Sequence, residues 1–160
     1  MIKKVFFAYE KILYERTKKI HDIKSKFFQN MIDDMFETMY YHNGVGLAAP
    51  QIGENYRLAV LDVKDGNPLV IVNPKIVRAE GSRKILEGCL SVPEWLGDVV
   101  RSEKVVVEAQ DRNGKTFRVR AESNLLAQCL EHEIDHLDGK LFIQKIKSSE
   151  ELWRITNDGK

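Results

Sequence analysis

The sequence has few cysteines and no long apolar run, and both absences narrow the classes of protein to consider. Its 160 residues include two cysteines, too few for the disulfide framework of a small secreted protein. No apolar stretch approaches the roughly 18 residues that a membrane helix needs. The apolar patch near the start is interrupted by charges and no small-residue cleavage site follows it, so we expect no signal peptide. The expected location is a reducing cytoplasm, away from membranes.

A strong net charge is also missing. The chain has 25 basic and 24 acidic residues, which gives a net charge of +1. No field strong enough to attract nucleic acid is therefore expected. The length and a hydrophobic fraction of 43% predict one globular domain over residues 1–160. The oligomeric state has no signature in the composition.

Residues 132–136 read His-Glu-Ile-Asp-His, and this is the most informative stretch of the chain. Two histidines four residues apart on a helix project from the same face, about one turn apart, so both imidazoles can reach one divalent metal. The glutamate after the first histidine can then act as general base on a water that the metal holds. The pattern predicts a metal-dependent hydrolase. The alternative is a charged helix that carries two histidines by chance.

The spacing of apolar residues predicts the other elements. A helical stripe runs from residue 24 to 41, and Asn43-Gly44 is its stop signal. Aliphatic and β-branched residues predict strands at 57–63, 69–77, 99–108 and 116–121. Pro74 indicates an edge position or a bulge, and the Asp-Arg-Asn-Gly sequence at 111–114 indicates a hairpin turn.

The C-terminal part is expected to begin with a second helix. Ser123 is its predicted N-cap, and the helix should run through Leu137 and end at Asp138-Gly139. We expect a last short strand at 141–146 and a short, fraying helix at 148–160. The predicted fold class is α+β, with antiparallel strands packed around a central metal-bearing helix and with an N-terminal helix.

A catalytic metal site of this kind needs a third protein ligand, and the two cysteines compete for that place. Cys129 lies three residues before His132, but about 10 Å along the helix axis separates it from His136. It is therefore expected to be a small buried residue beside the site. Cys89 follows a glycine, which suits a backbone close to a metal. From the residues alone, however, a core thiol explains Cys89 more simply, so the third ligand stays open.

Three segments together resemble the signature motifs of the peptide deformylase family. They are residues 44–51 (Gly-Val-Gly-Leu-Ala-Ala-Pro-Gln), 87–91 (Glu-Gly-Cys-Leu-Ser) and 132–136, and their order and spacing also match. The resemblance covers about residues 30–146. Residues 8–16 lack the Gly-Asp-Pro-like segment usual in the family, and the C-terminal helix of many members is short here.

The resemblance implies a reaction and the residues that perform it. The reaction is removal of the formyl group from the N-terminal methionine of newly synthesised polypeptides, near the ribosome. One divalent metal ion per chain is implied, natively Fe(II), with zinc, nickel or cobalt able to replace it. Glu133 is the implied base, and the side-chain amide of Gln51 and the backbone N–H of Leu90 are the implied donors to the oxyanion. The implied metal ligands are Cys89, His132 and His136.

The resemblance also implies a substrate cleft. Gly44 and Gly46 allow close approach of a peptide backbone, and Gly46 is expected to pair with the substrate main chain as an added strand. Three residues depart from the family pattern near this cleft: Gln128 replaces an aliphatic residue, Glu131 a glutamine and Leu96 an arginine. The side-chain preference is therefore open. The implied contacts of the methionine side chain are Val45, Leu125, Cys129 and the ring of His132.

Several alternatives remain at this point. Gln128 either narrows and polarises the pocket or points to solvent. Glu87 and Arg101 form either an ion pair that holds the cysteine loop or an ordinary surface pair, and Asp135 either orients a histidine or faces solvent. For the whole chain, the alternatives to an active deformylase are a general HExxH peptidase and a non-catalytic or substrate-altered relative that binds metal or peptide ends. The retained Glu133 and the two other motifs count against these alternatives.

Overall fold

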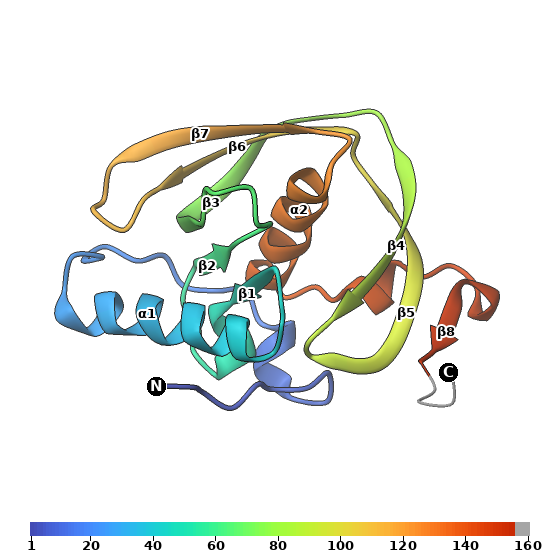
Figure 1. The fold of residues 1–160 in the computed structure, drawn as a ribbon, viewed down its shortest axis with the longest axis horizontal. Helices are drawn as coiled ribbons and strands as arrows, with labels where there is room; N and C mark the ends of the chain where they lie inside the picture. The colour runs from blue at the N-terminus through green and yellow to red at the C-terminus, as the bar shows by residue number, and fades with distance from the viewer. Residues whose placement is uncertain (156–160) are drawn as a thin grey trace.

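The computed structural model describes residues 1–155, and its architecture is α+β, which confirms the predicted fold class. A five-stranded sheet with the order β1-β2-β3-β6-β7 and a three-stranded sheet with the order β4-β5-β8 flank the central helix α2 (Leu125–Leu137) (Figure 1). The helix α1 (Lys26–Tyr41) lies along the large sheet, on the side away from α2.

The strand pairings are antiparallel throughout both sheets. The large sheet contains β1 (Gly46–Ala48), β2 (Leu58–Leu61), β3 (Leu69–Glu80), β6 (Lys104–Gln110) and β7 (Thr116–Glu122). The small sheet contains β4 (Arg83–Cys89), β5 (Val92–Arg101) and β8 (Leu152–Arg154). The 3-10 helices are η1 (Lys11–Tyr14), η2 (Ala49–Ile52), η3 (Phe142–Lys145) and η4 (Ser149–Glu151).

Alternate residues of β2 belong to two different cores. Leu58 and Val60 pack in the apolar cluster that contains α1, whereas Ala59 and Leu61 pack in the cluster that contains α2. Successive side chains of a strand point to opposite faces, so a strand covered on both faces is apolar at every position. The large sheet therefore supports α2 from one side and is itself supported by α1 from the other.

Helix α1 has the predicted limits to within two residues. It begins where the side chain of Ser25 accepts a hydrogen bond from the N–H of Phe28 at 3.4 Å. It ends where Asn43 takes a φ of 55° and the N–H of Gly44 donates to the carbonyl of Met39 at 2.9 Å. This is the left-handed stop that the Asn-Gly pair predicts.

Three of the predicted strands are confirmed, at β2, β3 and β7. The expected distortion at Pro74 is confirmed as a register shift in the β3–β6 pairing between Val72 and Lys75. The hairpin at 111–114 joins β6 to β7, and the N–H of Gly114 donates to the carbonyl of Asp111 at 3.0 Å.

The predicted strand at 99–108 is wrong, because the chain passes from one sheet to the other within it. β5 ends at Arg101 and β6 begins at Lys104. Between them the N–H of Ser102 donates to the side chain of Glu131 on α2 at 2.6 Å, instead of pairing within a strand. The β-branched residues continue through this crossing, so periodicity does not reveal it. β1 and β4 were not predicted at all.

The predicted N-cap of α2 is off by one residue. The N–H of Ser123 donates to the carbonyl of Glu103 at 2.7 Å and so continues the pairing of β6 with β7. Asn124 is the cap, and its Oδ1 accepts a hydrogen bond from the N–H of Ala127 at 2.9 Å.

The predicted strand at 141–146 and the predicted helix at 148–160 are also corrected. Residues Phe142–Lys145 form η3, because Oε1 of Gln144 accepts the N–H of Leu141 at 2.8 Å and closes a turn there. The tail forms η4 and the strand β8, which pairs with β5. Residues 156–160 of the predicted helix lie outside the described residues. Within 1–155, no helix is long and apolar enough to cross a membrane.

Candidate active site

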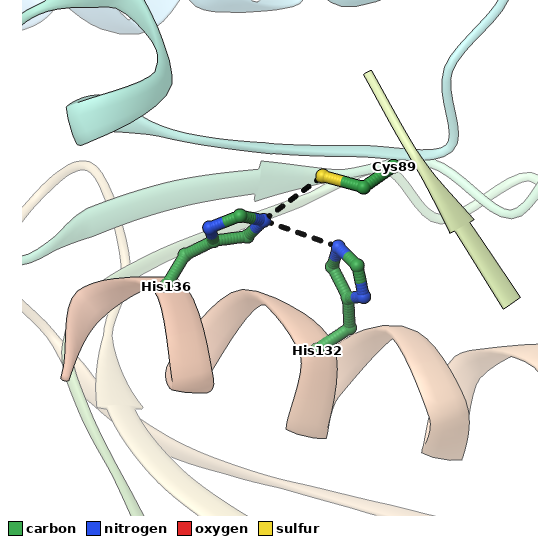
Figure 2. A group of neighbouring side chains, drawn as sticks. All are labelled: Cys89, His132 and His136. Atoms are coloured by element: carbon green, nitrogen blue, oxygen red, sulfur yellow. Dashed lines mark hydrogen bonds between the residues drawn. The ribbon is translucent and has the colours of Figure 1, made fainter. Parts of the chain in front are cut away.

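Cys89, His132 and His136 bring their ligand atoms together beside α2 (Figure 2). Sγ of Cys89 lies 3.2 Å from Nε2 of His136, and that nitrogen lies 3.2 Å from Nε2 of His132. All three atoms are within 4.8 Å of one another, and among residues 1–155 no other trio of Cys, His, Asp or Glu meets in this way. The structure thus brings Cys89, rather than Cys129, to the two histidines.

Two elements position these three side chains. Cys89 is the last residue of β4, and the histidines lie one turn apart on α2 with their ring centroids 4.8 Å apart. Cys129 instead packs in the apolar cluster between α2 and the large sheet. Burial raises the pKa of its thiol to about 12, which keeps it protonated and inert.

This donor set fits a divalent transition metal. A thiolate and two imidazoles are three protein ligands, and a fourth position is left for water or substrate. Burial lowers the pKa of His136 well below its usual value, so the ring is neutral, as a ligand must be. Burial opposes protonation of His132 too, but the charge of Glu133 and the hydrogen bonds with Cys89 and Glu87 outweigh it and raise the pKa of His132. The same electrostatic surroundings that favour a positive charge on the His132 ring also favour a metal cation bound beside it.

Glu133 is buried against the glycine-containing strand β1. Its Oε1 is buried and has no hydrogen-bond partner among residues 1–155, and burial raises the pKa of the carboxyl to about 7. Gly46 makes room for it, because a Cβ at that position would lie 2.9 Å from Cδ of Glu133. A buried carboxylate oxygen without a protein partner is free to bind a water or a substrate atom.

Glu87 holds His132 from the side opposite the ligand cluster. Its Oε2 lies 2.7 Å from Nδ1 of His132, and Arg101 donates to both carboxylate oxygens, at 3.0 and 2.5 Å. Burial alone would raise the pKa of Glu87, but the hydrogen bonds with His132 and Arg101 lower it to about 2. The predicted pair of Glu87 and Arg101 is therefore present and buried, not a surface pair.

Asp135 has neither of the two roles considered for it. Its carboxylate pairs with Nη1 of Arg101 at 2.5 Å and with Nζ of Lys145 at 3.3 Å. A buried guanidinium carries five N–H donors and needs more than one acceptor. Asp135 thus completes the set of acceptors around Arg101 rather than orienting a histidine.

Gln51 lies beside Cys89 with its amide orientation set by the backbone. Its Oε1 accepts the N–H of Ala48 at 2.9 Å. Its Nε2 therefore faces Oγ of Ser91 at 3.0 Å and Sγ of Cys89 at 3.6 Å. A donor fixed in this way next to the ligand cluster is suited to stabilise negative charge that develops there.

A cleft of about 390 Å³ opens onto these groups. Sequence reasoning did not place Leu86, Trp95 or Ile155, which are among its lining residues. Leu86 directly precedes the motif at 87–91, Trp95 follows it on β5, and Ile155 arrives through a long-range strand pairing that no local pattern reveals. The residues predicted for the substrate and the oxyanion all line the cleft: Gly44, Val45, Gly46, Gln51, Leu90, Leu125, Gln128 and Cys129.

The three departures from the family pattern lie in different surroundings. Leu96 and Gln128 line the cleft, whereas Glu131 bonds to Ser102 at the crossing between the sheets. Nε2 of Gln128 donates to Oε1 of Glu87 at 3.3 Å. Its amide therefore faces the carboxylate that holds His132 and does not simply point to solvent.

The fold and the site define a metal-dependent hydrolase with an HExxH helix and a Cys/His/His cluster. Residues 2–152 match the family described as polypeptide deformylase. The peptide deformylase of Dehalococcoides mccartyi is 43% identical over 152 residues, which is 93% of this chain and 89% of that protein. The peptide deformylase of Caldicellulosiruptor bescii is 47% identical over 145 residues, 91% of this chain and 86% of that protein.

Solved structures give the same result. A peptide deformylase from Legionella pneumophila has a TM-score of 0.89 at 46% identity, over 92% of this chain and 87% of that one. A peptide deformylase from Synechococcus elongatus in complex with actinonin has a TM-score of 0.86 at 39% identity, over 91% and 79%. The chain belongs to the polypeptide deformylase family, whose metal-dependent enzymes remove the N-formyl group from new polypeptides.

Proposed function

We propose that this chain removes the formyl group from N-terminal methionine, with one divalent metal ion held by Cys89, His132 and His136. The observation that carries the proposal is the meeting of these three donors within 4.8 Å, next to a buried carboxylate with a free oxygen. When bound, the metal supplies Lewis acidity and lowers the pKa of a water molecule. The donor set accepts zinc, nickel or cobalt, and the likeness to bacterial deformylases favours Fe(II).

The substrate lies along β1. Within residues 1–155 this strand forms the edge of the large sheet and pairs with β2 alone, and Gly46 at its start lines the cleft. An extended peptide can add to such an edge through its main chain. The methionine side chain then enters the pocket formed by Val45, Leu125, Cys129 and the ring of His132.

Glu133 moves the proton in this mechanism. It accepts a proton from the attacking water through its free oxygen and delivers it to the leaving amine. The amide of Gln51 and the backbone N–H of Leu90 donate to the oxyanion that forms on the formyl carbon. The products are formate and a peptide with a free α-amine.

The proposed setting is the cytoplasm near the ribosome, where the substrate is a nascent formyl-methionyl peptide. A reducing environment keeps the thiol of Cys89 available as a ligand. We also propose that residues 1–160 act as one catalytic domain.

Three substrates test the proposal with protein purified without oxygen: a formyl-Met peptide, an acetyl-Met peptide and a peptide with an unmodified N-terminus. We expect formate release from the first and no turnover of the other two. Cleavage of an internal peptide bond would indicate a general peptidase. Metal-loaded protein that turns over none of the three would indicate a non-catalytic relative.

A further inference from the structure

Four exposed apolar side chains meet at the mouth of the cleft. Leu86 of β4, Trp95 of β5, Leu125 at the start of α2 and Ile155 after β8 all line it, and they are 38–54% exposed. These four side chains are named the apolar rim. Two of them come from the hairpin of β4 and β5, and the other two from segments far from it in the sequence. A cluster of large apolar side chains in water beside a cleft is typical of a ligand-binding surface.

The position of Ile155 is built into the pairing of β8 with β5. Residues 95–97 pair with Leu152–Arg154, and the N–H of Ile155 donates to the carbonyl of Glu94 at 2.6 Å. A Cβ at Gly97 would lie 2.5 Å from Cδ1 of Ile146 and 3.3 Å from the carbonyl oxygen of Glu151, the residue that precedes β8. The glycine therefore lets Ile146 and the segment that precedes β8 pack closely against β5.

Two ion pairs join the same segment to its neighbours. Lys84 pairs with Glu151 at 3.1 Å, and Arg154 pairs with Glu94 at 3.4 Å. The second pair joins Arg154, next to Ile155 in the sequence, to Glu94, which lines the cleft. The match to the family ends at residue 152. Ile155, which lines the cleft, therefore lies outside the segment that matches the family.

We propose that Ile155, through its place in the apolar rim, makes the enzyme favour apolar residues directly after the N-terminal methionine. The inference rests on the proposed function. Leu125 belongs both to the methionine pocket and to the rim, so the two surfaces are continuous. An extended peptide advances about 3.3 Å per residue, so its next residues must pass the rim on leaving the pocket.

The test compares formyl-Met-Leu-Leu with formyl-Met-Ser-Ser in the metal-loaded enzyme. We expect the wild type to have the higher kcat/KM with the leucine peptide. Ile155→Ser should lower that value about fivefold, which is the scale of partly losing one apolar contact, and should leave the serine peptide unchanged. Leu86→Ser, on a different strand, should reproduce the loss.

Trp153→Ser is the matched control. Trp153 lies on β8, two residues before Ile155, and is 45% exposed, close to the 49% of Ile155, but it does not line the cleft. This variant should keep the wild-type ratio of kcat/KM for the leucine peptide to kcat/KM for the serine peptide. The inference is overturned if Ile155→Ser leaves the ratio of the two kcat/KM values unchanged or lowers kcat/KM equally for both peptides. It is also overturned if Trp153→Ser lowers the ratio as much as Ile155→Ser does. A wild type that releases formate equally from both peptides also overturns it, whereas one that releases none overturns the proposed function instead.

Discussion

Glu87 and His132 share a buried hydrogen bond, with 2.7 Å between Oε2 and Nδ1. The bond holds the imidazole so that Nε2 faces Cys89 and His136, and Arg101 anchors the carboxylate from β5. The proposed ligand His132 is therefore oriented by Glu87, which is not itself part of the Cys89, His132 and His136 cluster. Partners of this kind commonly affect metal affinity strongly.

The first prediction concerns this bond. Glu87→Gln should lower the affinity for the metal roughly 10–100-fold, because the amide holds the ring less firmly and adds no negative charge. Competition with a chelator measures the affinity. Glu131→Gln, which changes a carboxylate that bonds to Ser102 instead, is the control. Equal affinities for the Glu87 variant and the wild type would remove Glu87 from this role.

The second prediction concerns acid stability of the metal-free protein. The pKa of Glu87 is lowered from 4.5 to about 2, so its ionised form stabilises the fold above about pH 4.5. That contribution is lost as the pH falls from about 4.5 to about 2. Urea unfolding across this range should show a steeper loss of stability in the wild type than in Glu87→Gln. Parallel curves for the two proteins would contradict the assignment.

The third prediction separates the two cysteines. Cys89→Ala should abolish tight metal binding, because it removes the thiolate that lies 3.2 Å from Nε2 of His136. Cys129→Ala should keep about one metal per chain, since its thiol is buried in the apolar cluster. Metal analysis of both purified variants decides the matter. Loss in the Cys129 variant alone would reverse the assignment.

The fourth prediction concerns Gln128, which lines the cleft and donates to Glu87. Gln128→Ile should make the pocket less polar and raise kcat/KM for formyl-Met relative to formyl-alanine several-fold. A methylene-sized gain in apolar contact is worth roughly 1 kcal/mol. A series with formyl-norleucine and formyl-alanine provides the comparison. Identical selectivity in both enzymes would show that Gln128 does not shape the pocket.

What could be predicted from the sequence is mostly local. The HExxH spacing fixes the relation of His132 to His136 because one helix carries both, and the Asn-Gly stop and the bulge at Pro74 depend on a few adjacent residues. The strand that carries Cys89 was missed, and only the resemblance to deformylases pointed to this cysteine. The crossing at Ser102 and the arrival of Ile155 depend on pairing between distant segments, which periodicity does not encode.

Formate release by Glu133→Gln, with metal content measured in the same sample, tests the central claim most directly. Glutamine has almost the same shape as the buried glutamate but cannot accept the proton. We predict about one metal per chain, as in the wild type, and a kcat lower by about 10²–10⁴-fold. A variant that keeps its metal and turns over formyl-Met peptide at nearly the wild-type rate would contradict the role of Glu133 as the base.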